Sequence, residues 1–234
     1  ITDLIREKVD KDYAPRKDAP EGFVKFGTDR EILARKIRDD LRKNGAKGGR
    51  WYLLFRNNCF IDDMATTLQQ FIVPYSDQRG FCIAKRDMKK IKRYYQYRVA
   101  GYGSEESRKK FMEEYGIKDI NEDFIESNLI EGREKYFYQD LVNEWGIEFL
   151  EKMSELTQPY CLLSTIHKVK GGEADYTGLF MDCTKLVSDN IMFDSDSELR
   201  VLYVGVTRCR EGLYIIPAKS RYSMQKLMDL VGEV

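Results

Sequence analysis

The hydrophobic residues of the first 75 positions follow two alternating patterns. Two short segments are alternately or continuously apolar, which is typical of strands. Each is followed by a segment in which apolar residues recur at helical spacing. The expected elements are a strand over 21–26, a helix over 29–43, a strand over 51–55 and a helix over 61–71. Strands and helices in alternation indicate an α/β fold with a parallel sheet.

This alternation stops at about residue 76 and returns at about residue 159. The segment between them is rich in charged and aromatic residues and shows no strand pattern, so we expect a mainly helical insertion. Beyond it we expect strands over 160–164, 176–181 and 213–216, a helix over 195–211 and a last helix from about residue 222. The domain boundaries that follow are 1–75 for the first part of one domain, 76–158 for the insertion and 159–234 for the remainder.

Two of these helices are preceded by a capping-box pattern, in which a hydroxyl residue is followed three positions later by a carboxylate. Thr28 and Glu31 form the first pattern, and Ser195 and Glu198 form the second. Gly45 follows the first helix, as expected for a helix end.

Composition excludes several classes of protein. The 234 residues carry 39 basic and 39 acidic side chains, which argues against a wholly basic nucleic-acid coat protein but allows a local binding patch. Five scattered cysteines and a single histidine make a zinc site unexpected, and free thiols suit a reducing cytoplasm. No apolar run approaches the roughly 20 residues that span a bilayer, so we expect no membrane association. The chain opens on Ile1 without a signal peptide, and we expect an excised fragment.

The segment LSTIHKVKGGEAD, residues 163–175, is the first candidate site. A buried strand is expected to end in Thr165 and His167. The turn after it carries a cation, two glycines and a carboxylate, namely Lys170, Gly171, Gly172 and Glu173. Ligands of parallel sheets collect beyond the carboxyl ends of strands, so we expect these residues at strand ends. Hydroxyls, amides and a cation can bind phosphate there, although a lone histidine after a strand is more often structural or simply exposed.

The segment 195–210 is the second candidate site. Its apolar face is formed by Leu199, Leu202, Tyr203 and Val206. Arg208 lies near the expected end of this helix. One interpretation is a favourable interaction with the helix C-terminus. The other is an arginine finger whose planar fork reaches a phosphate.

These segments resemble conserved motifs of superfamily 1 DNA helicases of the UvrD/Rep/PcrA type. STIHKVKGGEAD, residues 164–175, resembles motif V (T-x-H-x-x-K-G-L/G-E), and ELRVLYVGVTR, residues 198–208, resembles motif VI. LLFRNN, residues 53–58, resembles the conserved strand end L-x-R-x-N. The resemblance implies a second RecA-like motor domain, a parallel sheet flanked by helices without its own P-loop. The insertion then corresponds to a reduced accessory subdomain.

The resemblance also implies roles for individual residues. Arg208 corresponds to the arginine that faces the γ-phosphate, and Glu173, in the turn with Gly171 and Gly172, to the carboxylate that contacts the ribose. The residues implied to contact single-stranded DNA are Thr165, His167, Asn58, Arg56 and Lys170. Arg200 corresponds to an arginine that orients motif VI by local ion pairing. Cys209 replaces the usual alanine, and Gly172 stands where leucine is common.

No GxxxxGK[ST] phosphate loop and no acidic magnesium-binding strand occur in the sequence. We therefore expect an upstream RecA-like domain of the same polypeptide to hold ATP and the ligands of Mg²⁺. The expected function is ATP-driven movement along single-stranded DNA, with binding and unwinding of duplex junctions, in the 3′ to 5′ direction that the family implies. By itself, this chain is expected not to hydrolyse ATP.

Two alternatives remain open at this point. The first alternative to an active motor domain is a catalytically inactive helicase-like scaffold or regulatory domain of a DNA-processing complex. The presence of Glu173 and Arg208 argues against this alternative. A free-standing α/β nucleotide-binding module with chance matches is the other alternative.

The insertion has a basic half and an acidic half. Residues 85–98 hold seven basic residues, one acid and three interleaved tyrosines, a pattern that suits either DNA binding or a solvated helix packed by its tyrosines. Residues 105–151 are strongly acidic and repel DNA, so we expect a helical cover, a protein contact or ion pairs with the basic half.

Overall fold

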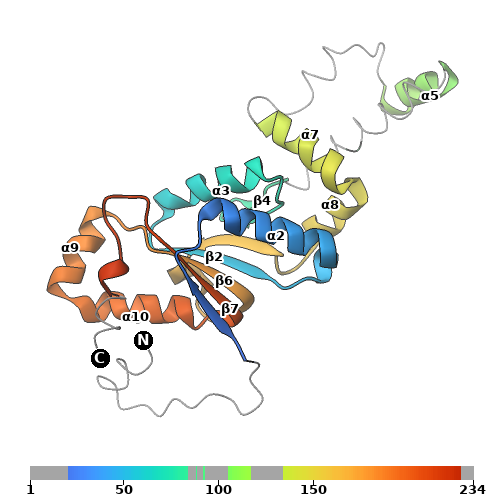
Figure 1. Ribbon diagram of the computed structural model, residues 1–234. Coiled ribbons are helices and arrows are strands. Elements are labelled where there is room, and N and C mark those ends of the chain that lie inside the picture. The colour runs from blue at the N-terminus through green and yellow to red at the C-terminus, as the bar shows by residue number, and fades with distance from the viewer. Residues whose placement is uncertain (1–20, 84–87, 89–91, 93–104, 117–133, 228–234) are drawn as a thin grey trace. The chain divides into compact units, whose positions relative to one another are not determined.

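A computed structural model describes residues 21–83, 88, 92, 105–116 and 134–227 (Figure 1). The chain divides into two compact units, residues 1–79 with 159–234 and residues 80–158. The sequence also predicts a helix followed by a polar connection in residues 1–20; this segment and most of the basic segment 85–98 lie outside the described residues.

The strands of the structure form a seven-stranded sheet in the order β1-β7-β6-β2-β5-β3-β4. Neighbouring strands from β1 through β3 in this order are all parallel. The strands are β1 (Phe23–Phe26), β2 (Trp51–Phe55), β3 (Ser76–Asp77), β4 (Gly80–Phe81), β5 (Cys161–Thr165), β6 (Ala174–Phe180) and β7 (Cys209–Ile216). The predicted α/β fold with a parallel sheet is confirmed.

Helices cover both faces of this sheet. α2 (Arg30–Asn44) and α3 (Ile61–Gln70) lie on one face, and α9 (Lys185–Phe193) and α10 (Ser195–Val206) lie on the other (Figure 1). Short 3₁₀ turns occur at η1 (Gly45–Lys47), η2 (Asn58–Phe60) and η3 (Ile166–Val169). Because both faces are covered, the central strand β2 is apolar throughout, as the run WYLLF predicts.

Successive side chains of the central strands pack against different helices. Leu54 belongs to the core beneath α10, together with Leu179, Leu202 and Ile166. On the opposite face, Gly178 lies so close to side chains of β2 and α2 that an added Cβ would come within 2.9 Å of Leu53. This close approach lets α2 pack directly on the sheet.

The starts of two helices differ from the sequence prediction. Asp29, rather than Thr28, caps α2 and accepts a hydrogen bond from the Glu31 amide at 2.7 Å. Asp194, rather than Ser195, caps α10 through the Ser197 amide at 3.3 Å. In both cases an aspartate directly beside the predicted hydroxyl residue supplies the oxygen, which is an equally good cap.

The segment after α10 also differs from expectation. We expected helix to residue 211, but α10 ends at Val206 and β7 begins at Cys209. Pairing of Cys209 with Ala174 of β6 draws these residues into the sheet. Tertiary pairing therefore overrides the local helical pattern.

Some short elements were not predicted. α9 was missed because exposed Leu186, Met192 and Phe193 obscure its apolar face. The two-residue strands β3 and β4 fall in the segment that we expected to be free of strands. They are too short to produce an alternating pattern.

The described part of the second unit is mainly helical. It contains α5 (Glu105–Tyr115), α7 (Glu134–Trp145) and α8 (Ile147–Ser154). Gly146, at φ 74°, joins α7 to α8, and Leu141, Leu150 and Met153 are buried. Lys92 forms an ion pair with Glu151, one example of the basic-to-acidic pairing considered above. None of the helices described here is long and apolar enough to span a membrane.

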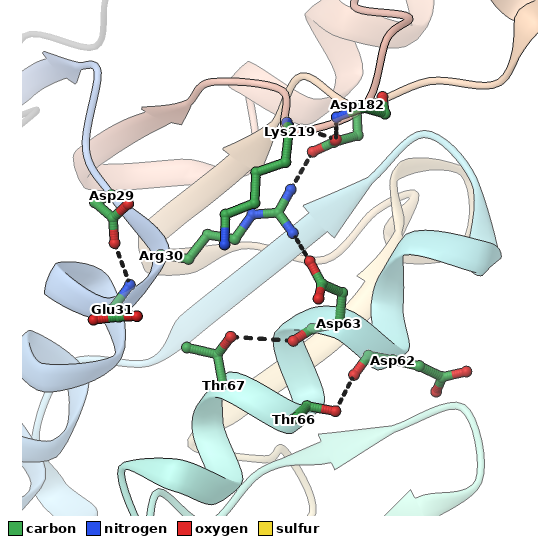
Figure 2. A network of polar contacts seen from close by, with 10 residues as sticks. Asp29, Arg30, Glu31, Asp62, Asp63, Thr66, Thr67, Asp182 and Lys219 are labelled. Carbon is green, nitrogen blue, oxygen red and sulfur yellow. Dashed lines mark hydrogen bonds and ion pairs between the residues drawn. The ribbon is translucent and has the colours of Figure 1, made fainter.

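A buried arginine joins four segments of the first unit (Figure 2). Arg30, at the start of α2, is 2% exposed and donates hydrogen bonds to Asp63 of α3 and to Asp182 beyond β6. Asp182 also accepts the backbone amides of Lys219 and Ser220, each at 2.9 Å. Asp182 therefore compensates the charge of Arg30 and fixes the chain after β7.

Replacing Asp182 by Ala should lower the free energy of unfolding by about 3–5 kcal/mol, because it removes the buried carboxylate that pairs with buried Arg30 and that accepts the amides of Lys219 and Ser220. Urea denaturation of the chain measures this. Asp62→Ala is the matched control, since Asp62 is 78% exposed and pairs only at the surface with Arg79; its expected cost is about 1 kcal/mol or less. Equal effects of the two substitutions would show that the Arg30 network does not support the fold.

Candidate functional site

The predicted site residues lie at two opposite edges of the sheet. Trp51 of β2 pairs with Cys161 of β5 and with Tyr176 of β6, so these positions are level. Thr165 lies beyond this level and Glu173 before it, which separates them along the strands by roughly 20 Å. The expectation that both stand at the same strand ends is therefore wrong. The chain between them crosses the α10 face of the sheet through η3, because a parallel strand must begin at the opposite edge.

The carboxyl edge carries the residues for which we predict DNA contacts. Asn58 and His167 are exposed there, whereas Thr165 is only 7% exposed. Gln78, after β3, donates a hydrogen bond to Asn58 and accepts one from the Lys168 ammonium at 2.6 Å. These exposed polar side chains form a hydrogen-bonded row across the ends of three neighbouring strands, β2, β5 and β3.

Sequence reasoning did not single out Gln78 or Lys168. Lys168 lies inside the motif V segment, and its charge was the available signal. No sequence pattern indicated Gln78, because only the parallel pairing of β3 with β5 brings it beside Asn58 and Lys168. Lys170 is exposed but lies in the crossover towards the other edge.

Arg56 is held by a carboxylate of α10. Its Nε and one terminal nitrogen donate to the two oxygens of Glu198 at 2.7 and 2.8 Å. The side chains are 18% and 4% exposed, and the hydrogen bonds that Arg56 donates to Glu198 raise the pKa of Arg56. Arg200, for which we predict local ion pairing, is exposed and forms no ion pair within the described part of the chain. Glu198 makes the ion pair of motif VI instead.

The amino edge carries the residues for which we predict nucleotide contacts. Gly171, at φ 88°, turns the chain into Gly172 and Glu173, just before β6. Glu173 accepts a hydrogen bond from Nε of Arg210 at 2.9 Å, and a terminal nitrogen of the same guanidinium forms an ion pair with it at 2.9 Å; both side chains are 46% exposed. Gly171 is needed here because residues with side chains rarely adopt this backbone conformation.

Arg208 lies beside this turn, between α10 and β7. Its guanidinium donates to the carbonyl oxygens of Gly172 and Val204 and to the hydroxyl of Thr207, each at 3.0 Å. The side chain is partly exposed. It therefore makes the helix C-terminal interaction considered above, and it also joins motif VI to the turn that carries Glu173. In the described residues, no cluster of three or more His, Cys, Asp or Glu side chains is arranged to hold a metal ion.

His167 is the only histidine of the chain, and its environment favours the neutral ring. Partial burial of the ring lowers its pKa below 6.5, the nearby Arg56 lowers the pKa further, and Glu198 acts in the opposite direction. Because the pKa of the folded state lies below that of the unfolded state, this residue contributes stability that is lost as the pH falls below about 6.5.

Proton NMR titration of the single imidazole checks this environment. We expect the pKa of His167 to rise in Arg56→Gln, which removes a positive charge, and to fall in Glu198→Gln, which leaves that charge uncompensated. Arg79→Gln should leave the pKa of His167 unchanged, because Arg79 is held by Asp77. Shifts of the same sign in the first two variants would contradict the arrangement of charges described here.

The two motif segments and the insertion fall within one recognised family. The family model of the UvrD-like helicase C-terminal domain matches residues 75–220, more than half of the chain. The match includes the turn with Glu173 and the segment ending in Arg208, whereas the strand-end resemblance at residues 53–58 lies outside it. A comparison with curated proteins gave no match. The chain belongs to the UvrD-like helicase C-terminal domain family.

Proposed function

We propose that this chain is the second motor domain of an ATP-dependent DNA helicase. With an adjoining RecA-like domain, it couples ATP hydrolysis to movement along single-stranded DNA and to unwinding. The observation that carries this proposal is the position of Arg208, partly exposed and hydrogen-bonded to the turn that presents Glu173. An arginine and a carboxylate on one exposed edge suit a nucleotide held by the facing domain.

The amino edge supplies two kinds of contact to ATP. Arg208 offers a planar cation that matches the oxygens of a γ-phosphate and stabilises charge that develops during transfer. Glu173 offers carboxylate oxygens, which accept hydrogen bonds from ribose hydroxyls. Hydrolysis of bound ATP supplies the free energy, and we propose that the adjoining domain provides the phosphate loop and the ligands of Mg²⁺.

The carboxyl edge supplies contacts for a single strand. The amides of Asn58 and Gln78 can bond to the DNA backbone or to bases, and the Lys168 ammonium can neutralise a phosphate. His167 lies beside them with its neutral ring available for stacking or hydrogen bonding. A local group of this kind is compatible with a net charge of zero.

Movement requires these contacts to differ between two states. We propose that the two domains close on ATP and open after hydrolysis, and that the DNA contacts differ in strength between the closed and open forms. A ligand shifts a conformational equilibrium only through such a difference in affinity. The 3′ to 5′ direction is proposed from the family.

The five cysteines are free thiols, which supports a cytoplasmic location.

Substitution of Arg208 tests the catalytic part of the proposal. In a protein that joins this chain to its RecA-like partner domain, Arg208→Ala should lower DNA-stimulated ATP turnover by about 10³-fold or more, with a modest loss of nucleotide affinity. Arg208→Lys keeps the charge but loses the planar fork, and it should also be strongly impaired.

Two controls accompany this experiment. Thermal unfolding of each variant separates loss of catalysis from loss of the hydrogen bonds to Gly172 and Val204. The 234-residue chain alone should show no ATP turnover. Turnover within a few-fold of wild type in a folded Arg208→Ala variant would contradict the catalytic role of Arg208. Absence of DNA-stimulated turnover in the wild-type joined protein would instead favour the inactive scaffold.

A further inference from the structure

Helix α10 connects the two edges of the sheet. Glu198 lies in its first turn, against Arg56 at the carboxyl edge, and Arg208 follows its last turn, against Gly172 at the amino edge. Twelve helical residues span about 18 Å, comparable to the length of the strands. The two ends of one helix therefore touch the predicted DNA edge and the predicted nucleotide edge.

The contact at the DNA edge is strong and directional. Arg56 and Glu198 form a bidentate pair in which the carboxylate is 4% exposed. Loss of Arg56 leaves the Glu198 carboxylate buried and unpaired, and loss of Glu198 leaves the partly buried Arg56 guanidinium unpaired. Either change therefore destabilises the contact between α10 and the end of β2. The pair also fixes the start of α10 to the residues that follow β2, close to Asn58.

The last turn of α10 packs on the crossover that carries His167. A Cβ added at Gly205 would lie 2.9 Å from Leu179 and 3.5 Å from Ile166, so the helix backbone lies close to both side chains. Ile166 is 1% exposed and stands between Thr165 and His167 in the chain. Close-packed side chains transmit displacement, so a shift of this crossover also shifts α10.

We propose that Arg56 and Glu198 are positioning residues, which hold α10 to the DNA edge so that an occupied DNA edge changes the placement of Arg208. The proposal rests on the proposed function, and it assigns Arg56 a contact with α10 in place of the direct DNA contact that the family resemblance implies. Neither residue touches the nucleotide in this account. Their effect on ATP turnover passes through the helix.

The two roles of Arg56 give opposite results when Glu198 is changed. If Arg56 positions α10, then Arg56→Gln, Glu198→Gln and the double variant all break the same contact and share one defect. If Arg56 binds a phosphate directly, only Arg56→Gln weakens DNA binding, and the dependence of the affinity on salt falls by about one phosphate contact. Glu198→Gln then frees the arginine and leaves binding intact or stronger.

The first experiment follows backbone amide signals of the ¹⁵N-labelled 234-residue chain without DNA. Thr207 and Arg208 donate their amides to Tyr203 and Gly205, so their signals report the end of α10. Arg56→Gln and Glu198→Gln should both shift these signals, which lie nine and ten residues along the chain from Glu198. Arg79→Gln, which removes another arginine–carboxylate pair, should not shift them. Unshifted signals in both variants overturn the proposal.

The second experiment adds a single-stranded oligo-dT at increasing salt. In the wild type and in Arg79→Gln, oligo-dT should shift the Thr207 and Arg208 signals. This response should be lost equally in Arg56→Gln, Glu198→Gln and the double variant, without a change in the salt dependence of affinity. The exchanged pair, Arg56→Glu with Glu198→Arg, should restore part of the response.

The outcomes separate the proposal from the function on which it rests. A response retained in Glu198→Gln but lost in Arg56→Gln overturns the positioning role and supports direct DNA contact. Absence of oligo-dT binding by the wild type contradicts the proposed function, while the amide shifts without DNA still decide whether the ion pair positions the end of α10.

Discussion

Each connection between parallel strands returns the chain from the carboxyl edge of a sheet to its amino edge. This constraint governs the placement of the site residues here. The residues after β2 and β5 remain at the carboxyl edge, whereas the residues just before β6 and β7 stand at the other edge. Motif V therefore contributes to both edges, with His167 at one and Glu173 at the other. One short segment thus places residues of the same domain on both proposed ligand edges.

Guanidinium groups paired with buried carboxylates fix the helices that connect these edges. Arg30 joins α2 and α3 to the segments that follow β6 and β7, and Arg56 joins the end of β2 to α10. A buried ion pair adds little net stability compared with an apolar contact, but breaking one is costly. Such pairs therefore select one arrangement of the elements. At Arg208 the contacts are instead made with backbone oxygens and a hydroxyl, and the side chain stays partly exposed.

Much of the fold could be predicted from the sequence, because the central strands and helices have recognisable patterns of apolar residues. The apolar run of β2, the helical spacing of α2 and the glycine after it all predict the observed elements. Features that depend on tertiary pairing were not accessible. β7 begins at Cys209 because it pairs with β6, and the exposed apolar residues of α9 hide its helical pattern.

The candidate site shows the same division between local and long-range information. The motif segments identify Glu173 and Arg208 by residue type and spacing, but not the edge on which they stand. The partners of charged residues are long-range as well, since 142 positions separate Arg56 from Glu198. No local pattern distinguishes an arginine that faces DNA from one that is held by a distant carboxylate.

The central claim is that Arg208 faces a nucleotide held by another domain. The most direct measurement is a crystal structure of this chain joined to its RecA-like partner domain, with oligo-dT, ADP, Mg²⁺ and aluminium fluoride as a mimic of the transferring phosphate. The account predicts that the Arg208 guanidinium leaves at least one of its protein acceptors and lies within hydrogen-bonding distance of the fluoride. An Arg208 that keeps its bonds to Gly172 and Val204 and points away from the bound nucleotide would contradict it.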